Sequence, residues 1–96
     1  MSENLDKAVA ALNDKLGGAD FGGTAKFVIT GEGGVIVDSK GARISDDPAD
    51  VTLTASADTF QDIMSGDLNP TSAFMTGKLK VDGDMGLAMK LASHMA

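Results

Sequence analysis

The clearest structural signal in the sequence lies near its end, in Lys78-Leu79-Lys80-Val81-Asp82-Gly83-Asp84-Met85-Gly86-Leu87-Ala88-Met89-Lys90-Leu91. Its first four residues alternate lysine with an apolar side chain, which predicts a strand with one buried face. Asp84 is a residue type that caps helices, and residues 85–96 carry three polar side chains. The stretch therefore predicts a strand followed directly by a helix that is apolar around most of its circumference.

This final helix has two apolar stripes at helical spacing. Met85, Met89 and Ala92 form one stripe, and Leu87, Ala88 and Leu91 form its neighbour. A terminal helix of a small α+β domain has one side to bury, so we expect the second stripe to face a partner, a membrane or a bound apolar ligand. The alternative is that its alanine and glycine positions count as neutral surface.

The rest of the chain divides into elements with start and stop signals. Apolar residues recur at helical spacing near the start of the chain, at Leu5, Ala8, Val9, Leu12 and Leu16. They predict a helix with one apolar face between residues 2 and 17, ended by the glycine pair 17–18. Alternating or short apolar runs predict strands within 24–30, 35–38, 42–44 and 50–55, which we expect to form a four-stranded meander. Two helices are expected next, from Ser56 to Gly66 and from Asn69-Pro70 to Gly77.

Length, charge and composition exclude several classes of protein. Ninety-six residues make one domain, 1–96, with a single core. The chain has no cysteine and one histidine, so a disulfide framework, a thiolate zinc site and a multi-histidine metal site are excluded. A net charge of −6 argues against nucleic-acid binding. No apolar run is long enough to span a membrane, and residues 1–4 do not open a signal peptide, so we expect a cytoplasmic protein.

The apolar residues are mostly small or flexible. The chain contains 13 alanines, 12 glycines and six methionines, but four phenylalanines as its only aromatic residues. Small side chains do not fill a wide space between layers, and methionine adapts to irregular shapes. The composition is therefore compatible with an internal cavity or with a thin, tightly packed core.

No motif carries catalytic chemistry. Residues 31–34, Gly-Glu-Gly-Gly, join two strands and are not followed by a Lys-Ser/Thr pair, so they form a turn rather than a phosphate loop. Residues 83–86 have the spacing of an RNA-backbone clamp, but their aspartate would repel phosphate. Asp46, Asp47 and Asp50 lack calcium-loop spacing, and His94 lies near the end of the chain. We therefore expect a protein that is not an enzyme and needs no cofactor or metal.

Three lysines raise a further hypothesis. Lys78 and Lys80 share one side of the predicted last strand, and Lys90 lies on the last helix. They would receive an anionic head group if they met at the mouth of a cavity. The alternative is a solvated strand face.

The second half of the chain resembles a known family. The resemblance is carried by Ala49-Asp50-Val51-Thr52-Leu53-Thr54, Phe60, Ile63-Met64-Ser65-Gly66, Asn69-Pro70-Thr71-Ser72-Ala73-Phe74, Gly77-Lys78-Leu79-Lys80-Val81 and Gly83-Asp84-Met85-Gly86-Leu87-Ala88-Met89-Lys90-Leu91. These motifs, over residues 49–92, are similar to those of the sterol carrier protein 2 family. The resemblance implies an α+β fold in which a five-stranded, mostly antiparallel sheet is covered by helices that enclose an apolar tunnel. It further implies non-catalytic binding or transfer of a fatty acid, fatty acyl ester, sterol-like or isoprenoid lipid.

The resemblance also implies which residues contact the lipid. The expected lipid-binding residues are Phe60, Ile63, Met64, Phe74, Met75, Met85, Leu87, Met89 and Leu91. Leu53, Leu79 and Val81 are expected on the sheet side of the tunnel, in part as ordinary core.

The chain departs from the family pattern in places that affect location and ligand. It ends without the peroxisomal tripeptide common among relatives, so a cytoplasmic location is expected. Thr76 stands where the family often has glutamine, and Asp84 where it often has asparagine. The change at residue 76 implies different polar contacts in the tunnel. Asp84, together with the net charge of −6, favours neutral or singly charged lipids over coenzyme A esters.

Two alternative functions follow from the same residues. The protein could be an accessory subunit that presents a lipid intermediate to a partner enzyme. It could instead be a protein-interaction domain that docks through its apolar last helix. The sequence is compatible with a monomer or a weak dimer.

Overall fold

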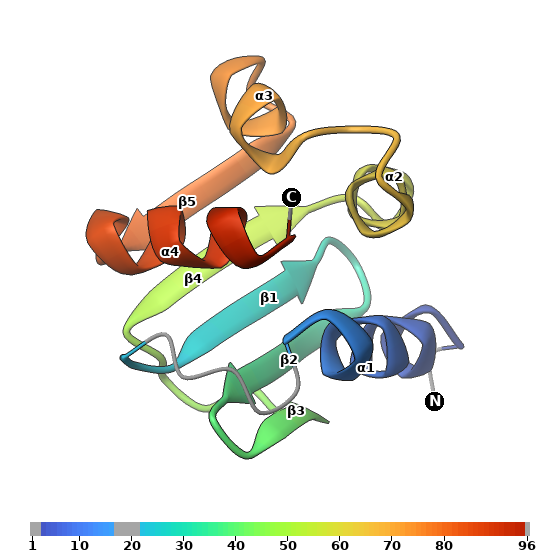
Figure 1. Ribbon diagram of the computed structural model, residues 1–96. Helices are drawn as coiled ribbons and strands as arrows, with labels where there is room; N and C mark the ends of the chain where they lie inside the picture. The colour runs from blue at the N-terminus through green and yellow to red at the C-terminus, as the bar shows by residue number, and fades with distance from the viewer. Residues whose placement is uncertain (1–2, 17–21, 96) are drawn as a thin grey trace.

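The computed structural model describes residues 3–16 and 22–95 (Figure 1). The elements are α1 (Glu3–Leu16), β1 (Ala25–Ile29), β2 (Gly33–Asp38), β3 (Gly41–Ile44), β4 (Val51–Ala55), α2 (Ala57–Ser65), α3 (Pro70–Met75), β5 (Leu79–Gly83) and α4 (Met85–Met95). All nine predicted elements are present in the predicted order. The expected stop of the first helix at the glycine pair 17–18 lies outside the described residues.

The strands form one mixed sheet in the order β3-β2-β1-β4-β5, so the predicted meander of the first four strands is wrong. β4 pairs in parallel with β1, Ala25 opposite Val51, while all other neighbours are antiparallel. The loop 45–50 connects β3 to β4 across the sheet. It lies on the face opposite the buried residues of β1, where the Lys26 ammonium donates to the Asp46 carbonyl at 3.4 Å. A five-stranded, mostly antiparallel sheet with helices, an α+β fold, is confirmed.

Asp50 fixes the start of β4 against the start of β1. Its carboxylate accepts from the Thr24 backbone N–H at 3.0 Å, and its own N–H donates to the Thr24 carbonyl at 2.9 Å. The Asp50 carbonyl accepts from the Asp84 N–H at 3.0 Å, just after β5 ends. One residue therefore ties together the first strand, the fourth strand and the beginning of α4.

The helices divide the sheet between them (Figure 1). α1 packs on β2 and β3, whereas α4 packs on β4 and β5, with α3 beside α4 and α2 beside α1. Under α1 the core is tight, because Leu5, Ala8 and Leu12 pack with the buried valines of β2. The other half of the sheet is left to α2, α3 and α4.

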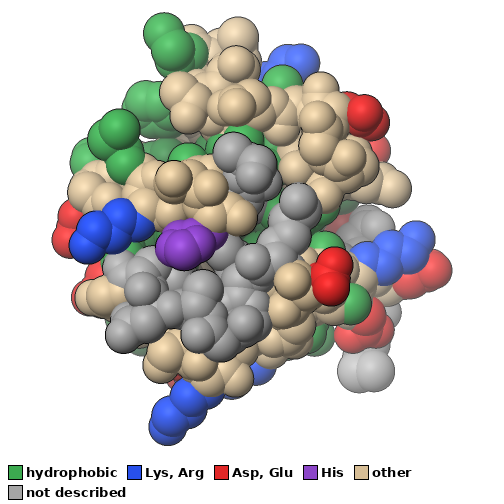
Figure 2. Space-filling model, in the orientation of Figure 1, with side chains coloured by type: hydrophobic (Ala, Val, Ile, Leu, Met, Phe, Trp, Pro, Cys, Tyr) green, Lys and Arg blue, Asp and Glu red, His purple; other side chains and the backbone are tan. Residues whose placement is uncertain are grey.

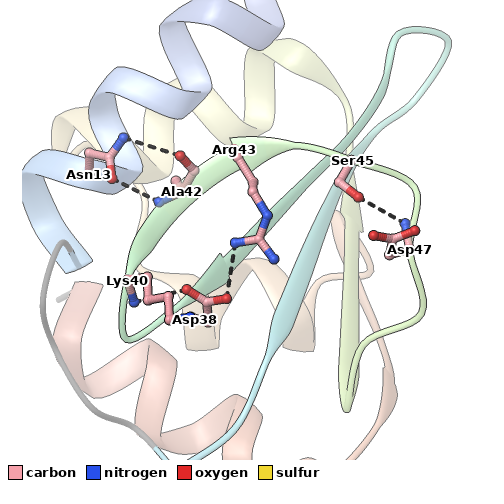
Figure 3. Close-up of polar contacts among 7 residues, drawn as sticks. All are labelled: Asn13, Asp38, Lys40, Ala42, Arg43, Ser45 and Asp47. Atoms are coloured by element: carbon pink, nitrogen blue, oxygen red, sulfur yellow. Dashed lines mark hydrogen bonds and ion pairs between the residues drawn. The ribbon is translucent and has the colours of Figure 1, made fainter.

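Polar contacts hold α1 on its half of the sheet (Figure 3). The Asn13 amide accepts from the Ala42 N–H at 2.8 Å and donates to the Ala42 carbonyl at 3.4 Å, which satisfies part of the open edge of β3. On the adjoining turn, the Arg43 guanidinium 3.0 Å away and the Lys40 N–H lower the pKa of Asp38 below its ordinary 3.8. A side chain of α1 therefore takes part of the place that another strand would have at this edge.

The predicted helix caps are confirmed. Ser56 Oγ accepts from the Thr59 N–H at 3.2 Å, and Gly66 ends α2 in the left-handed conformation. Asn69 accepts from the Thr71 N–H at 2.8 Å, ahead of α3. Asp84 accepts from the Leu87 N–H at 3.1 Å, which caps α4 immediately after β5.

Gly83 and Gly77 offer a matched test of the junction between β5 and Asp50. Both have positive φ, +109° and +81°, but a Cβ at Gly83 would lie 2.5 Å from the Asp50 carbonyl oxygen, whereas one at Gly77 would meet nothing within 4 Å. We expect Gly77→Ala to lower the free energy of unfolding by about 1 kcal/mol, the cost of left-handed backbone. Gly83→Ala should cost at least about 2 kcal/mol more, because backbone atoms must shift. Urea unfolding measures both, and equal losses would contradict the described junction.

Candidate functional site

A cavity of about 500 Å³ lies between the β4–β5 half of the sheet and the helices α2, α3 and α4. The residues that line it are Phe27, Leu53, Phe60, Ile63, Asn69, Pro70, Thr71, Phe74, Met75, Leu79, Val81, Met85, Ala88, Met89, Ala92 and Ser93. None of these described side chains is ionisable. The polar members are an asparagine, a threonine and a serine, each of them exposed.

The cavity has a buried floor and an exposed rim. At the floor, the rings of Phe27 and Phe60 meet edge to face with centroids 5.7 Å apart, and both side chains are buried. At the rim, Met75 and Met89 are 79% and 73% exposed, and Phe74 is 43% exposed. Figure 2 shows hydrophobic side chains gathered on the surface between α3 and α4, at the upper left. An apolar chain entering at this rim would end against the phenylalanines.

The structure brings six of the nine predicted lipid-contact residues together. These are Phe60 and Ile63 from α2, Phe74 and Met75 from α3, and Met85 and Met89 from α4. Leu53, Leu79 and Val81 line the sheet side, as expected, and Leu53 and Leu79 also belong to the core. The alternation in β5 directs Leu79 and Val81 inward and leaves Lys80 exposed on the opposite face.

The other three predicted residues lie elsewhere. Leu87 and Leu91 are buried in the core, at 6% and 0% exposure, because their stripe of α4 faces the sheet. Met64 borders a separate crevice of about 110 Å³ between α1 and α2. The stripe of Met85, Met89 and Ala92 thus lines the cavity, Leu87 and Leu91 close the core, and Ala88 does both. Ala88 is buried, so the neutral-surface alternative fails at that position.

Some residues of the lining were not predicted. Ala92 lies on the same helical stripe as Met85 and Met89, so its place was available from the spacing. Phe27 shares the buried face of β1 with Ala25 and Ile29, and strand alternation alone does not indicate that one of these three residues lines a cavity. Asn69, Pro70 and Thr71 line the cavity because the start of α3 lies at its rim. The sequence predicts where α3 begins in the chain but not where it lies relative to the sheet.

The three lysines do not gather at this cavity. Lys78 and Lys80 are exposed, and neither is part of the lining. The Lys90 ammonium extends toward Gly22, 3.8 Å from where a Cβ on that glycine would lie. The structure therefore gives no support to the hypothesis of a lysine-lined head-group site.

Residues 3–16 and 22–95 contain no cluster of three histidine or acidic side chains able to hold a metal ion. In the same part of the chain, none of the helices combines the length and the apolar character needed to traverse a lipid bilayer.

Comparison with known proteins identifies the family. Residues 3–96 match the family model described as "SCP-2 sterol transfer family". The chain is 42% identical over 96 residues to hydroxysteroid dehydrogenase-like protein 2 of Bos taurus, covering 99% of this chain and 22% of the relative. It is 55% identical over 47 residues to sterol carrier protein 2 of Homo sapiens, covering 49% of this chain and 9% of the relative. The chain thus spans about a fifth or less of the length of these curated relatives.

Solved structures show the same fold. The solution structure of Aedes aegypti sterol carrier protein-2 in complex with palmitate superimposes with a TM-score of 0.79 and 30% sequence identity, covering 100% of this chain and 97% of that one. The resemblance seen in the motifs of residues 49–92 is therefore confirmed over the whole length. On sequence and on architecture, this chain belongs to the SCP-2 sterol transfer family.

Proposed function

We propose that this domain binds a lipid with a long apolar chain in the cavity and transfers it without changing it chemically. The observation that carries the proposal is a cavity of about 500 Å³ whose described lining has no ionisable side chain and whose open rim exposes Phe74, Met75 and Met89. That volume lies within the range of roughly 300–1,000 Å³ typical of small-molecule sites. Family membership and the palmitate complex of the Aedes aegypti relative support the same assignment.

The lining provides enough apolar surface to hold an alkyl chain. Each buried methylene contributes about 0.8 kcal/mol, so ten of them contribute about 8 kcal/mol before the costs of ordering the ligand. A micromolar dissociation constant needs a net gain of about 8 kcal/mol, so the bound chain must bury more than ten methylenes to offset the cost of association. The methionines from α3 and α4 adapt to ligands of different shape, which favours tolerance of several lipids over selection of one.

The charge around the cavity favours small head groups. No lysine or arginine is among the described lining residues, and the chain carries a net charge of −6. The head group of a bound fatty acid would therefore stay at the rim, in contact with water. A polyanionic coenzyme A ester would gain no cationic partner there, so we propose neutral or singly charged lipids as ligands. A cytoplasmic location remains a prediction from the sequence.

Native mass spectrometry of the freshly purified protein tests the proposal directly. We expect a one-to-one adduct that disappears on denaturation, and the organic extract should contain a fatty acid, sterol-like or isoprenoid lipid. A protein of apo mass that stays unchanged after addition of palmitate would contradict the proposal and favour a protein-interaction domain.

A carboxylate placed in the cavity wall should prevent binding. Ala92 lines the cavity and is half-buried, whereas His94, two residues further along α4, is exposed and outside the lining. We expect Ala92→Asp to weaken palmitate binding at least tenfold, because desolvating the new charge costs more than about 1.4 kcal/mol. His94→Asp is the matched control and should bind as the wild type does. Fluorescence displacement measures both affinities, circular dichroism checks the fold, and equal affinities would exclude this wall as the ligand site.

A second candidate function is presentation of the lipid to an enzyme. The observation that favours it is that the chain spans 22% of a relative named hydroxysteroid dehydrogenase-like protein 2. In that relative the matching region is part of a longer protein. This arrangement suggests that the domain delivers its bound lipid to an enzyme in the same assembly rather than from one membrane to another.

Vesicle transfer separates the two candidate functions. A carrier should move a fluorescent fatty acid from donor to acceptor vesicles at a rate proportional to protein concentration, because its apolar rim is open. A presenting subunit would bind the same lipid stoichiometrically and yet accelerate no transfer. We expect the first outcome; binding without transfer would favour the second candidate.

A further inference from the structure

The Phe60 ring separates two apolar volumes. It lines the cavity described above and also the crevice of about 110 Å³ between α1 and α2. Among the described residues, Phe60 is the one that the two linings share. The side chain is 7% exposed and packs edge to face on Phe27, so it fills the floor between the two spaces.

The position of Phe60 on α2 explains this double contact. Ile63 lies on the side of the helix that faces the cavity, whereas Ala57, Gln61 and Met64 border the crevice. Phe60 stands where these two sides of the helix meet, one turn from both Ala57 and Met64. One aromatic ring thus borders both spaces, and it is the described side chain through which the two linings meet.

The crevice is suited to the end of an alkyl chain. Its lining is Lys7, Ala8, Ala11, Ile29, Ala57, Phe60, Gln61 and Met64, of which five besides Phe60 are apolar. Ala8 and Ile29 are buried, and Ala11, Ala57 and Met64 are half-buried. An apolar cavity of about 150 Å³ is known to hold a benzene ring, so the crevice together with the space vacated by a displaced phenyl ring has room for several methylenes.

We infer that the crevice between α1 and α2 is a second compartment of the lipid site, and that the Phe60 ring, by closing or opening it, sets the length of chain the protein prefers. The inference rests on the proposed lipid-binding function. A chain that enters at the methionine rim reaches the Phe60 ring at the floor. A longer chain either leaves methylenes in water at the rim or displaces the ring and extends between α1 and α2. Met64, which lies outside the main cavity, contacts the ligand in the second case.

The test compares affinities for a saturated fatty acid series from laurate to lignocerate. Phe60→Ala should raise the ratio of lignocerate to palmitate affinity by at least tenfold, the gain from burying about two further methylenes. Phe74→Ala is the matched control. It removes the same ring from the rim of the cavity, away from the crevice, so it should alter both affinities without changing their ratio.

A second variant keeps the test independent of the stability of Phe60→Ala. Ala11→Leu fills the crevice from α1 and should lower the lignocerate-to-palmitate ratio of the otherwise wild-type protein by about tenfold. Nuclear Overhauser contacts from the terminal methyl of bound lignocerate to the Ala11 and Ala57 methyl groups would locate the chain end. Unchanged ratios in Phe60→Ala and Ala11→Leu, with palmitate still bound, would overturn the second compartment and leave the proposed function intact. Failure of the wild type to bind any member of the series would refute the proposed function itself.

Discussion

The parallel pairing of β4 with β1 sets the position of every element that follows it in the chain. It places β4 and β5 on the side of the sheet that α1 does not cover, and α4 must then return over them. Asp50 secures this arrangement with three hydrogen bonds, two to Thr24 and one from the Asp84 N–H. Because α4 begins directly at this point, its angle over the sheet is set by the strand junction. The position of the cavity thus follows from the order of the strands in the sheet.

The two halves of the sheet are covered differently, one by a packed core and the other by a cavity. Under α1, alanine and leucine pack closely on the valines of β2, which gives the thin core that the composition allows. Under α4 a cavity remains although phenylalanine, leucine and methionine side chains line it, because α2 and α3 stand at the margin of the sheet. A cavity and a tight core, which the composition presented as alternatives, occur side by side.

Local features of this fold could be predicted and non-local ones could not. Ser56, Asn69 and Asp84 act on backbone groups two or three residues away, so their sequence context is sufficient to identify them. The crossing of loop 45–50 depends on contacts with strands far away in the sequence, and turn residues alone favoured the wrong meander. Helical spacing likewise defined the two stripes of α4 but not which one faces the sheet. The family resemblance implied Leu87 and Leu91 as ligand contacts, although both belong to the core. The expectation of a tunnel came from family resemblance rather than from spacing.

The exposed methionine rim makes the ligand site chemically vulnerable. Met75 and Met89 are among the most exposed large apolar side chains of the described residues, and their thioethers are open to oxidants in solution. Oxidation to the sulfoxide converts a flexible apolar side chain into a polar one. An apolar chain would then cross a hydrated entrance both on arrival and on departure. Oxidation of these two surface sulfur atoms would therefore make the entrance of the cavity polar without any oxidant reaching its floor.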